Sequence, residues 1–143
     1  MCRLLAFSSL ERKSFYDVVG NEFDKFVAMS SEHKDGWGYA HDGQILKDVN
    51  PAHESDSLER AKSEVLTDGA LLHLRLASKG INVNIDNNHP FTYGTTTFMH
   101  NGTIRPGNTA EQFIADKYKG FLQSTTDSER FFYALLSQVD EHG

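Results

Sequence analysis

The chain has 143 residues, of which 38% are hydrophobic and 24% are charged, and its formal net charge is −6 at pH 7. This length favours one domain over residues 1–143. The negative charge argues against a nucleic-acid binder or a protein of anionic membrane surfaces, because both need a basic face. The sequence has no apolar run near the roughly 20 residues of a membrane span and no signal-peptide pattern. A single cysteine excludes an internal disulfide and favours a reducing cytoplasm.

The first two residues, Met1 and Cys2, indicate a candidate nucleophile. A small second residue permits removal of the initiator methionine, which would leave Cys2 with both a free α-amine and a thiol. Their unperturbed pKa values are about 7.7–8.0 and about 8.5, so the amine can act as the base for the sulfur. A chance Met-Cys start is the alternative, and Cys2 alone does not decide between the two.

The apolar run 3–7 predicts a buried strand that would fix the chain end inside a site. Apolar residues at three- and four-residue steps over 15–27 predict one or two helical turns, weakened by Gly20 in the middle. Asp42-Gly43 between residues 37–40 and 44–49 predicts a hairpin. Residues 55–66 predict a surface helix.

Residues 70–77 predict a further strand, with Leu72, Leu74 and Leu76 on one face and His73 and Arg75 on the other. The polar face is either a solvent-exposed sheet surface or part of a site. The segment alone leaves both open.

The polar loop 78–90 is long enough to indicate a functional segment. A β-rich run over 93–99 then ends in His100-Asn101-Gly102. Asn-Gly at a strand end is usually a turn. It can also place a side-chain amide beside a backbone N–H, which is what an oxyanion hole requires.

The C-terminal part predicts two helices. Residues 109–112 carry a capping-box pattern, and residues 126–139 follow with an apolar face. Asp127 near the start of the last helix is either an N-terminal cap or a carboxylate for a ligand amine. The expected buried face of this helix consists of Phe131, Phe132, Leu135, Leu136 and Val139.

An ordered set of segments resembles the class II glutamine amidotransferases, which are N-terminal nucleophile hydrolases, and the stand-alone bacterial type in particular. Each segment is weak alone, but together they follow the order of the family over residues 1 to about 130. They are Met1-Cys2-Arg3-Leu4-Leu5, Asp35-Gly36-Trp37-Gly38, His73-Leu74-Arg75-Leu76-Ala77-Ser78, Asn88-His89-Pro90-Phe91, His100-Asn101-Gly102 and Thr126-Asp127-Ser128-Glu129.

The resemblance implies an α+β fold, a four-layer αββα sandwich of antiparallel sheets. About five candidate strands are too few for both sheets, so we expect the chain to be the N-terminal part of such a domain. An incomplete sandwich would expose apolar sheet, which predicts self-association.

The resemblance also implies a role for each residue. Cys2 would be the nucleophile, with Asn101 and Gly102 as the oxyanion hole. Arg75 would bind the α-carboxylate of the substrate, and Asp127 its α-ammonium group. Two further positions would shape the pocket and one would line it; these are Gly36, Trp37 and Ser78.

The implied activity is hydrolysis of the γ-amide of glutamine or of a γ-glutamyl compound, without cofactor or metal. A separate synthase is the expected acceptor of ammonia. One alternative is a non-catalytic binding or assembly module that retains the fold. Another is a metal site at His73, His89 and His100, which would require their nitrogens to converge on one ion at about 2 Å.

Overall fold

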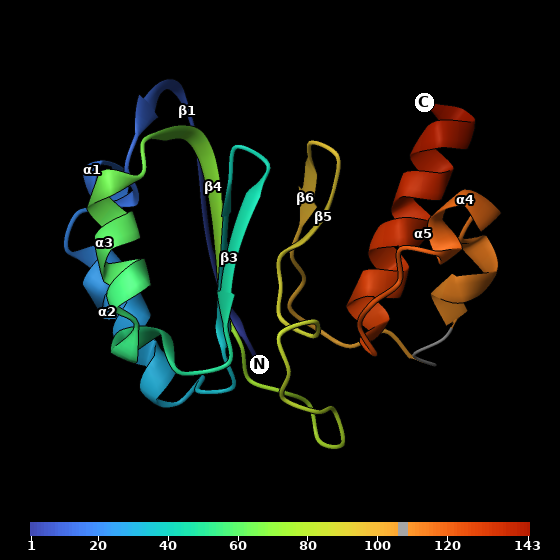
Figure 1. Ribbon diagram of the computed structural model, residues 1–143, viewed down its shortest axis with the longest axis horizontal. Coiled ribbons are helices and arrows are strands. Elements are labelled where there is room, and N and C mark those ends of the chain that lie inside the picture. Colours follow the sequence, from blue (N-terminus) through green and yellow to red (C-terminus); the bar gives the residue numbers. More distant parts are fainter. Residues whose placement is uncertain (106–108) are drawn as a thin grey trace. The chain divides into compact units, whose positions relative to one another are not determined.

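The structure is a computed structural model that describes residues 1–105 and 109–143 (Figure 1). These residues divide into two compact units, Met1–Asn101 and Gly102–Gly143. Each unit is described by itself. In the described part of the chain, no helix is both long and apolar enough to cross a membrane.

The first unit is organised around a four-stranded antiparallel sheet with strand order β1-β4-β2-β3. Arg3 at the start of β1 lies opposite Leu74 at the end of β4, and Trp37 at the start of β2 faces Leu74 from the other side. The N-terminus therefore lies at the sheet end where β4 runs into the loop after residue 77. The strands are β1 (Arg3–Lys13), β2 (Trp37–His41), β3 (Gln44–Asp48) and β4 (Thr67–Leu74).

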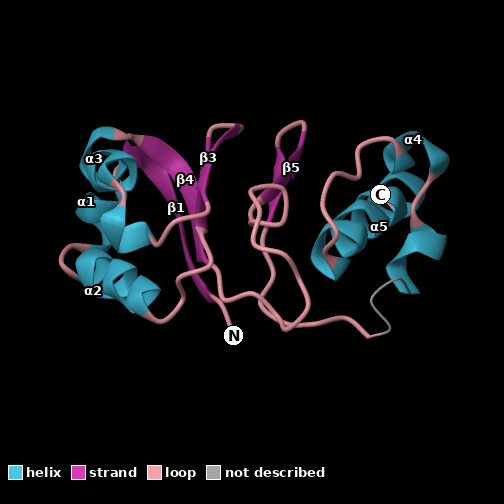
Figure 2. Cartoon of the chain, turned by 60° about the horizontal axis from the view of Figure 1, so that its bottom comes forward, coloured by secondary structure: helices cyan, strands magenta, loops and turns pink. Residues whose placement is uncertain are grey.

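Helices cover one face of this sheet (Figures 1 and 2). They are α1 (Phe15–Val19), α2 (Glu22–Ala28) and α3 (Asp56–Glu64), with short 3₁₀ turns at Met29–Ser31 and Ala52–Glu54. Ser14 begins α1 with a capping box to Asp17, and Gly20, at φ +56°, ends it. The glycine expected to weaken the helical turns thus separates two short helices.

The hydrophobic core lies between this helical layer and the sheet. Alternation along the strands sends every second side chain into it. Each large apolar side chain buried there contributes about 1.5–3 kcal/mol. The core contains Phe15, Phe23, Trp37, Tyr39, Leu58, Leu72 and Leu74.

A two-stranded hairpin, β5 (Phe91–Tyr93) and β6 (Thr96–Phe98), lies on the other face of the sheet (Figures 1 and 2). The sequence predicted one run over 93–99, but Gly94, at φ +57°, turns the chain inside it. The expected α+β class with antiparallel sheets is confirmed.

The hairpin is attached to the sheet by a close backbone contact at Gly38 on β2. A Cβ atom on Gly38 would lie 1.9 Å from the carbonyl oxygen of His89. Glycine is therefore required here for the segment 88–90 to reach the sheet.

The second unit contains a 3₁₀ turn (Thr109–Phe113), α4 (Asp116–Lys119) and α5 (Asp127–His142). The helix expected to begin at Thr109 is therefore a 3₁₀ turn. Thr126 caps α5 by accepting the backbone N–H of Glu129, whose carboxylate accepts that of Ser124.

The apolar face predicted for α5 is wrong at two of its five positions. Phe132 is buried as expected, but Leu135 is 40% exposed and Val139 is 60% exposed. The helix instead buries Tyr133, whose ring centroid lies 5.8 Å from that of Tyr118, and Ser137, which accepts the backbone N–H of Ala115 at 2.9 Å. The short segments before α5 thus determine which side it buries.

We predict that Gly38→Ala lowers the free energy of unfolding by about 2–3 kcal/mol or more, because the new methyl group overlaps a backbone carbonyl that cannot rotate away. Urea denaturation followed by circular dichroism measures the change. Gly69→Ala on β4 is the matched control, since its Cβ would stay 3.4 Å from the nearest atom. Equal stability of the two variants would contradict the close contact.

Candidate active site

Cys2 lies half-buried immediately before β1, beside the end of β4. Its Sγ accepts the backbone N–H of Leu76 at 3.3 Å and lies 3.5 Å from the carbonyl oxygen of the same residue. The pairing of Arg3 with Leu74 produces this position, because the antiparallel register continues past both strand ends. The thiol is therefore held by main-chain atoms.

Asn101 reaches the same place from the end of the segment after β6. Its Nδ2 donates to the carbonyl oxygen of Cys2 at 2.9 Å. An amide NH₂ group carries two donors, so one can hold Cys2 while the other serves a ligand. Gly102, the other expected oxyanion donor, is the first residue of the second unit.

Arg75 is 4% exposed and points away from the helical face, as strand alternation requires. Its Nη1 donates to Oδ1 of Asn88 at 3.3 Å, and its Nη2 donates to the carbonyl oxygen of Asn82 at 3.0 Å. Burial lowers the pKa of Arg75, whereas the negative charges of Asp35 and of the Cys2 thiolate raise it. The solvent-facing alternative for the His73–Arg75 face does not hold.

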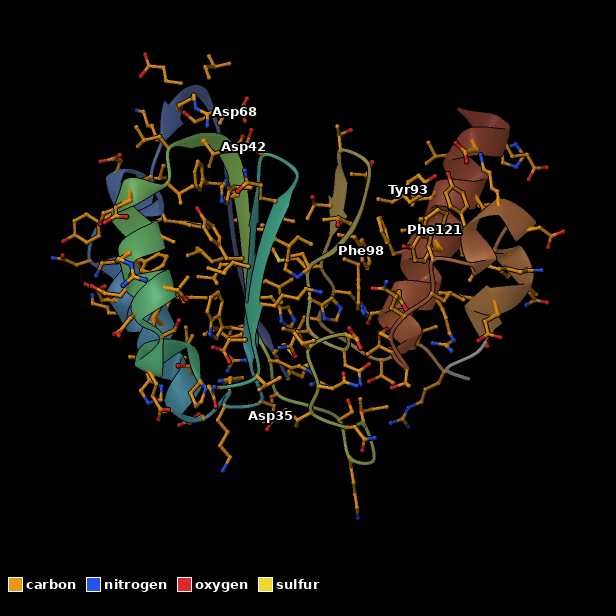
Figure 3. All side chains as sticks on the ribbon, in the orientation of Figure 1. Asp35, Asp42, Asp68, Tyr93, Phe98 and Phe121 are labelled. Carbon is orange, nitrogen blue, oxygen red and sulfur yellow. The ribbon has the colours of Figure 1, made fainter. Side chains whose placement is uncertain are left out.

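Asp35 and Gly36 fix the backbone around Arg75. The Arg75 N–H donates to the Gly36 carbonyl at 2.8 Å, and the Asp35 N–H donates to the Arg75 carbonyl at 3.1 Å. The Asp35 carboxylate accepts the Ala77 N–H at 2.8 Å, where the long loop begins. Figure 3 shows Asp35 at one end of the sheet and Asp42 and Asp68 at the other.

Asn88 contacts Arg75, although the sequence assigned Asn88 no role. Its Nδ2 donates to the Asp48 carbonyl at 2.7 Å and to the Trp37 carbonyl at 3.5 Å, while its Oδ1 accepts from Arg75. Gly36, at φ +107°, leaves room for it, because a Cβ there would lie 2.4 Å from Nδ2 of Asn88. The feature that marks Asn88 is its complete burial beside a cationic residue. The loop sequence does not reveal that burial, so the sequence alone could not identify Asn88.

The remaining predicted residues occupy different environments. The indole of Trp37 belongs to the core on the helical side, so only its backbone reaches the Arg75 side. Ser78 is exposed at the start of the loop, and its carbonyl accepts the Ile81 N–H at 3.0 Å. The pocket roles of Gly36, Trp37 and Ser78 stay predictions.

Asp127 belongs to the second unit, so its role toward a substrate stays a prediction. Its Oδ2 accepts the backbone N–H of Ile104 at 2.5 Å, and its Oδ1 accepts from the Ser128 hydroxyl at 3.3 Å. The side-chain cap of α5 comes from Thr126 rather than from Asp127.

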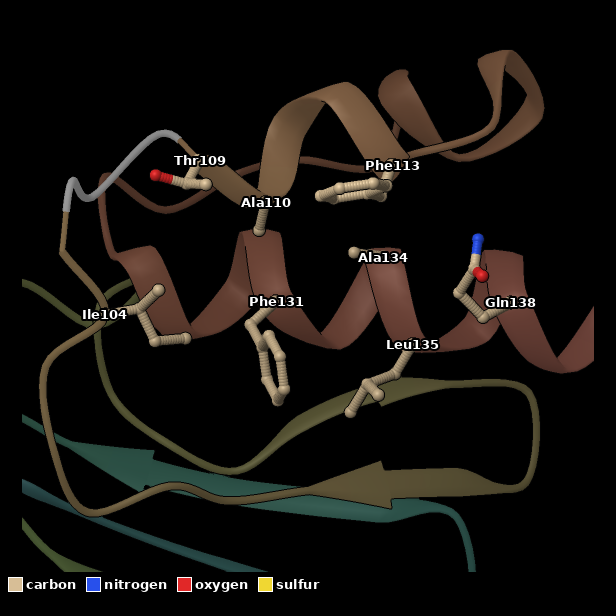
Figure 4. A pocket seen from close by; sticks show the side chains of 8 residues that line it. All are labelled: Ile104, Thr109, Ala110, Phe113, Phe131, Ala134, Leu135 and Gln138. Atoms are coloured by element: carbon tan, nitrogen blue, oxygen red, sulfur yellow. The ribbon is translucent and has the colours of Figure 1, made fainter.

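The second unit also contains an apolar pocket of about 340 Å³ along α5, shown in Figure 4. Its lining carries no charged side chain and none of the predicted site residues. One lining residue, Ile104, also donates its backbone N–H to Asp127, so the pocket adjoins the surroundings of that carboxylate. The lining residues are Ile104, Thr109, Ala110, Phe113, Phe131, Ala134, Leu135 and Gln138.

His73 and His89 form a buried stack in the first unit, with ring centroids 4.5 Å apart and an interplanar angle of 26°. Across residues 1–105 and 109–143, no group of three or more His, Cys, Asp or Glu side chains is arranged to hold a metal ion. Burial lowers the pKa of His73 to about 4 and also lowers that of His89. Both rings are therefore neutral at neutral pH.

Comparison with known proteins gives a consistent assignment. Residues 1–143 match the family described as class II glutamine amidotransferases. The probable glutamine amidotransferase DUG3 of Saccharomyces cerevisiae is 29% identical over 168 aligned positions, which cover 100% of this chain and 47% of that protein. A solved class II glutamine aminotransferase domain protein from Silicibacter pomeroyi has the same fold, with a TM-score of 0.68 and 24% identity over 99% of this chain and 57% of its own. The chain thus spans about half the length of these relatives.

We predict that the buried imidazoles make stability fall with acid. An unfolded histidine titrates near 6.5, and folded His73 titrates near 4, so the unfolded chain binds more protons between these values. The contribution of His73 is complete above pH 6.5 and is lost as the pH falls toward 4, by on the order of 3 kcal/mol in total.

Urea denaturation between pH 7.5 and 4 measures this dependence. His73→Phe keeps a ring of similar shape and should flatten the slope in that window. His142→Gln, which removes an exposed histidine at the end of α5, should leave the slope unchanged. A wild-type slope that His73→Phe does not change would contradict the prediction.

Proposed function

Because this chain belongs to the class II glutamine amidotransferases, we propose that it hydrolyses the γ-amide of glutamine or of a γ-glutamyl compound through a thioester on Cys2. The observation that carries the proposal is the meeting of three elements at one sheet end. Cys2 lies beside Leu76, Asn101 donates to the Cys2 carbonyl, and Arg75 directly precedes Leu76 in the chain.

The reaction begins with maturation. With Met1 attached, the nitrogen of Cys2 is an amide and cannot accept a proton. Removal of Met1 would give an α-amine with a pKa near the working pH, which takes the thiol proton. The Leu76 N–H, already 3.3 Å from Sγ, favours the thiolate that results.

The thiolate attacks the γ-amide carbon and forms a tetrahedral oxyanion. The second Nδ2 proton of Asn101 and the backbone N–H of Gly102 would donate to it, each contributing about 3 kcal/mol. The α-ammonium of Cys2 then gives its proton to the leaving nitrogen, the C–N bond breaks, and ammonia departs. Water attacks the remaining thioester, the C–S bond breaks, and the γ-carboxylate product leaves with the thiol restored.

Substrate selection would come from the two ends of the amino-acid group. Arg75 uses two of its five N–H donors on Asn82 and Asn88, and the other three suit an α-carboxylate. Asp127 would bind the α-ammonium. Fixing both ends sets the distance of the amide from sulfur, and ideal positioning lowers the barrier by about 7 kcal/mol or more.

We predict that protein with a free Cys2 amine takes up one equivalent of a diazo-ketone analogue of glutamine. Intact mass spectrometry should show loss of methionine and one adduct, and Cys2→Ala should show none. Since Cys2 is the only cysteine, an adduct on Cys2→Ala would place the reaction elsewhere. Processed protein without an adduct would contradict the catalytic proposal and favour the non-catalytic module.

We predict that Arg75→Lys raises KM for glutamine about 10- to 100-fold with a smaller change in kcat, because an ammonium cannot replace the planar fork at a carboxylate. Steady-state ammonia release measures both constants. Arg12→Lys is the matched control, because Arg12 binds Asp42 at the opposite end of the sheet. An unchanged KM for Arg75→Lys would remove Arg75 from the binding site.

A further inference from the structure

The His73–His89 stack has no part in the proposed reaction. Both side chains are nearly inaccessible to solvent, with exposed fractions of 0% and 6%. Within the described chain, none of their four ring nitrogens makes a hydrogen bond of ordinary geometry. The His100 backbone lies close enough to His73 to favour its protonated form, but burial outweighs this effect. Buried polar atoms are usually paired, so these two rings require an explanation.

Each histidine of the stack is close in the chain to one member of the Arg75–Asn88 pair. His73 precedes Arg75 by two residues on the same face of the β4 segment, which is about 6–7 Å along a strand. His89 directly follows Asn88, whose Oδ1 accepts from Arg75. One histidine thus belongs to the chain segment of Arg75 and the other to the chain segment of Asn88.

The position of His89 is tightly defined. Its carbonyl lies against Gly38, where no side chain fits, and its ring is held between His73 and Phe91, at centroid distances of 4.5 and 4.6 Å. Asn88 is fixed next to it by the carbonyls of Asp48 and Trp37. Removing the His89 ring would leave a void between His73 and Phe91, directly after the residue that accepts from the guanidinium.

Burial keeps the stack uncharged, and the surrounding charges add to this effect. Lys47 from β3, Arg75 from the end of β4 and His100 after β6 all disfavour a positive charge on either ring. Each histidine also lies against the other, so one proton on the stack opposes a second. A neutral ring beside Arg75 adds no repulsion, whereas a protonated ring would push the guanidinium away.

We propose that the stacked, neutral His73–His89 pair is a positioning element that holds Asn88 and Arg75 in the geometry that receives the substrate carboxylate. The proposal rests on the function proposed above for the choice of ligand. It assigns the two histidines a role through Arg75 and not in contact with the reacting atoms. Ring shape and neutrality are the two properties that the role requires.

The test uses the Arg75 Nε–H signal in ¹⁵N NMR spectra, assigned by its loss in Arg75→Lys, together with the dissociation constant of L-glutamine for the Cys2→Ala background. His89→Ala should shift the Arg75 signal and weaken glutamine binding about tenfold or more, since a displacement near 1 Å has large effects on a positioned group. His89→Phe should restore both toward wild type at pH 7.5. His41→Phe is the matched control, because the His41 ring packs against Tyr39 at a centroid distance of 5.1 Å but His41 lies opposite Ala70, five residues from Arg75.

A pH series from 7.5 to 4 separates neutrality from shape. Glutamine binding to the Cys2→Ala protein should weaken toward pH 4. When His73→Phe and His89→Phe are added to that protein, binding should weaken less over the same pH range. An acid dependence that arises outside the stack would appear in both proteins and therefore cancels in the comparison.

The inference is overturned if His89→Ala leaves the Arg75 signal in place, or if the double variant keeps the full acid dependence of binding. Where His89→Ala does not fold, the Phe variants and the pH series decide the question alone. Absence of glutamine binding to the Cys2→Ala protein, together with absence of ammonia release by the wild-type protein, would contradict the proposed function. The Arg75 signal would still decide whether the stack positions Arg75.

Discussion

The first unit depends on one close approach, between the His89 carbonyl and the α-carbon of Gly38. The absence of a side chain at Gly38 lets the segment 88–90 lie directly on β2. From this contact the chain continues into β5 and β6 on one side, and Asn88 turns toward Arg75 on the other. The contact between Gly38 and the His89 carbonyl thus determines both where the β5–β6 hairpin lies and which groups surround Arg75.

The sequence predicted the local parts of this arrangement well. The glycine break after α1, the Asp42-Gly43 hairpin and the alternation along β4 are set by neighbours in the chain, and each is present. Alternation also placed His73 and Arg75 on one face. It could not show that this face is buried, because the covering segment lies more than ten residues further on.

Contacts between residues far apart in the chain could not be predicted from the sequence. Asn88 reaches Asp48 across 40 positions, and Asp35 reaches Ala77 across 42, so neither partner is signalled by spacing. The turn at Gly94 was not predicted, because the threonine-rich residues around it favour a single continuous strand. On α5, periodicity marked apolar positions, whereas burial follows the short segments that happen to pack on it, including Tyr118 and Ala115. The resemblance to a family supplied what spacing could not, by naming Cys2 and Asn101 together.

The partners of the sulfur are main-chain atoms of Leu76, and the amide of Asn101 holds the main-chain carbonyl of Cys2. Such contacts are insensitive to which side chain stands at position 76, but they depend on the alignment of β1 with β4. A shift of that alignment by one residue would remove them while leaving the composition of both strands unchanged. Variation among related sequences at this position is therefore a poor guide to its importance. Insertions or deletions within the two strands are the changes that this part of the molecule cannot tolerate.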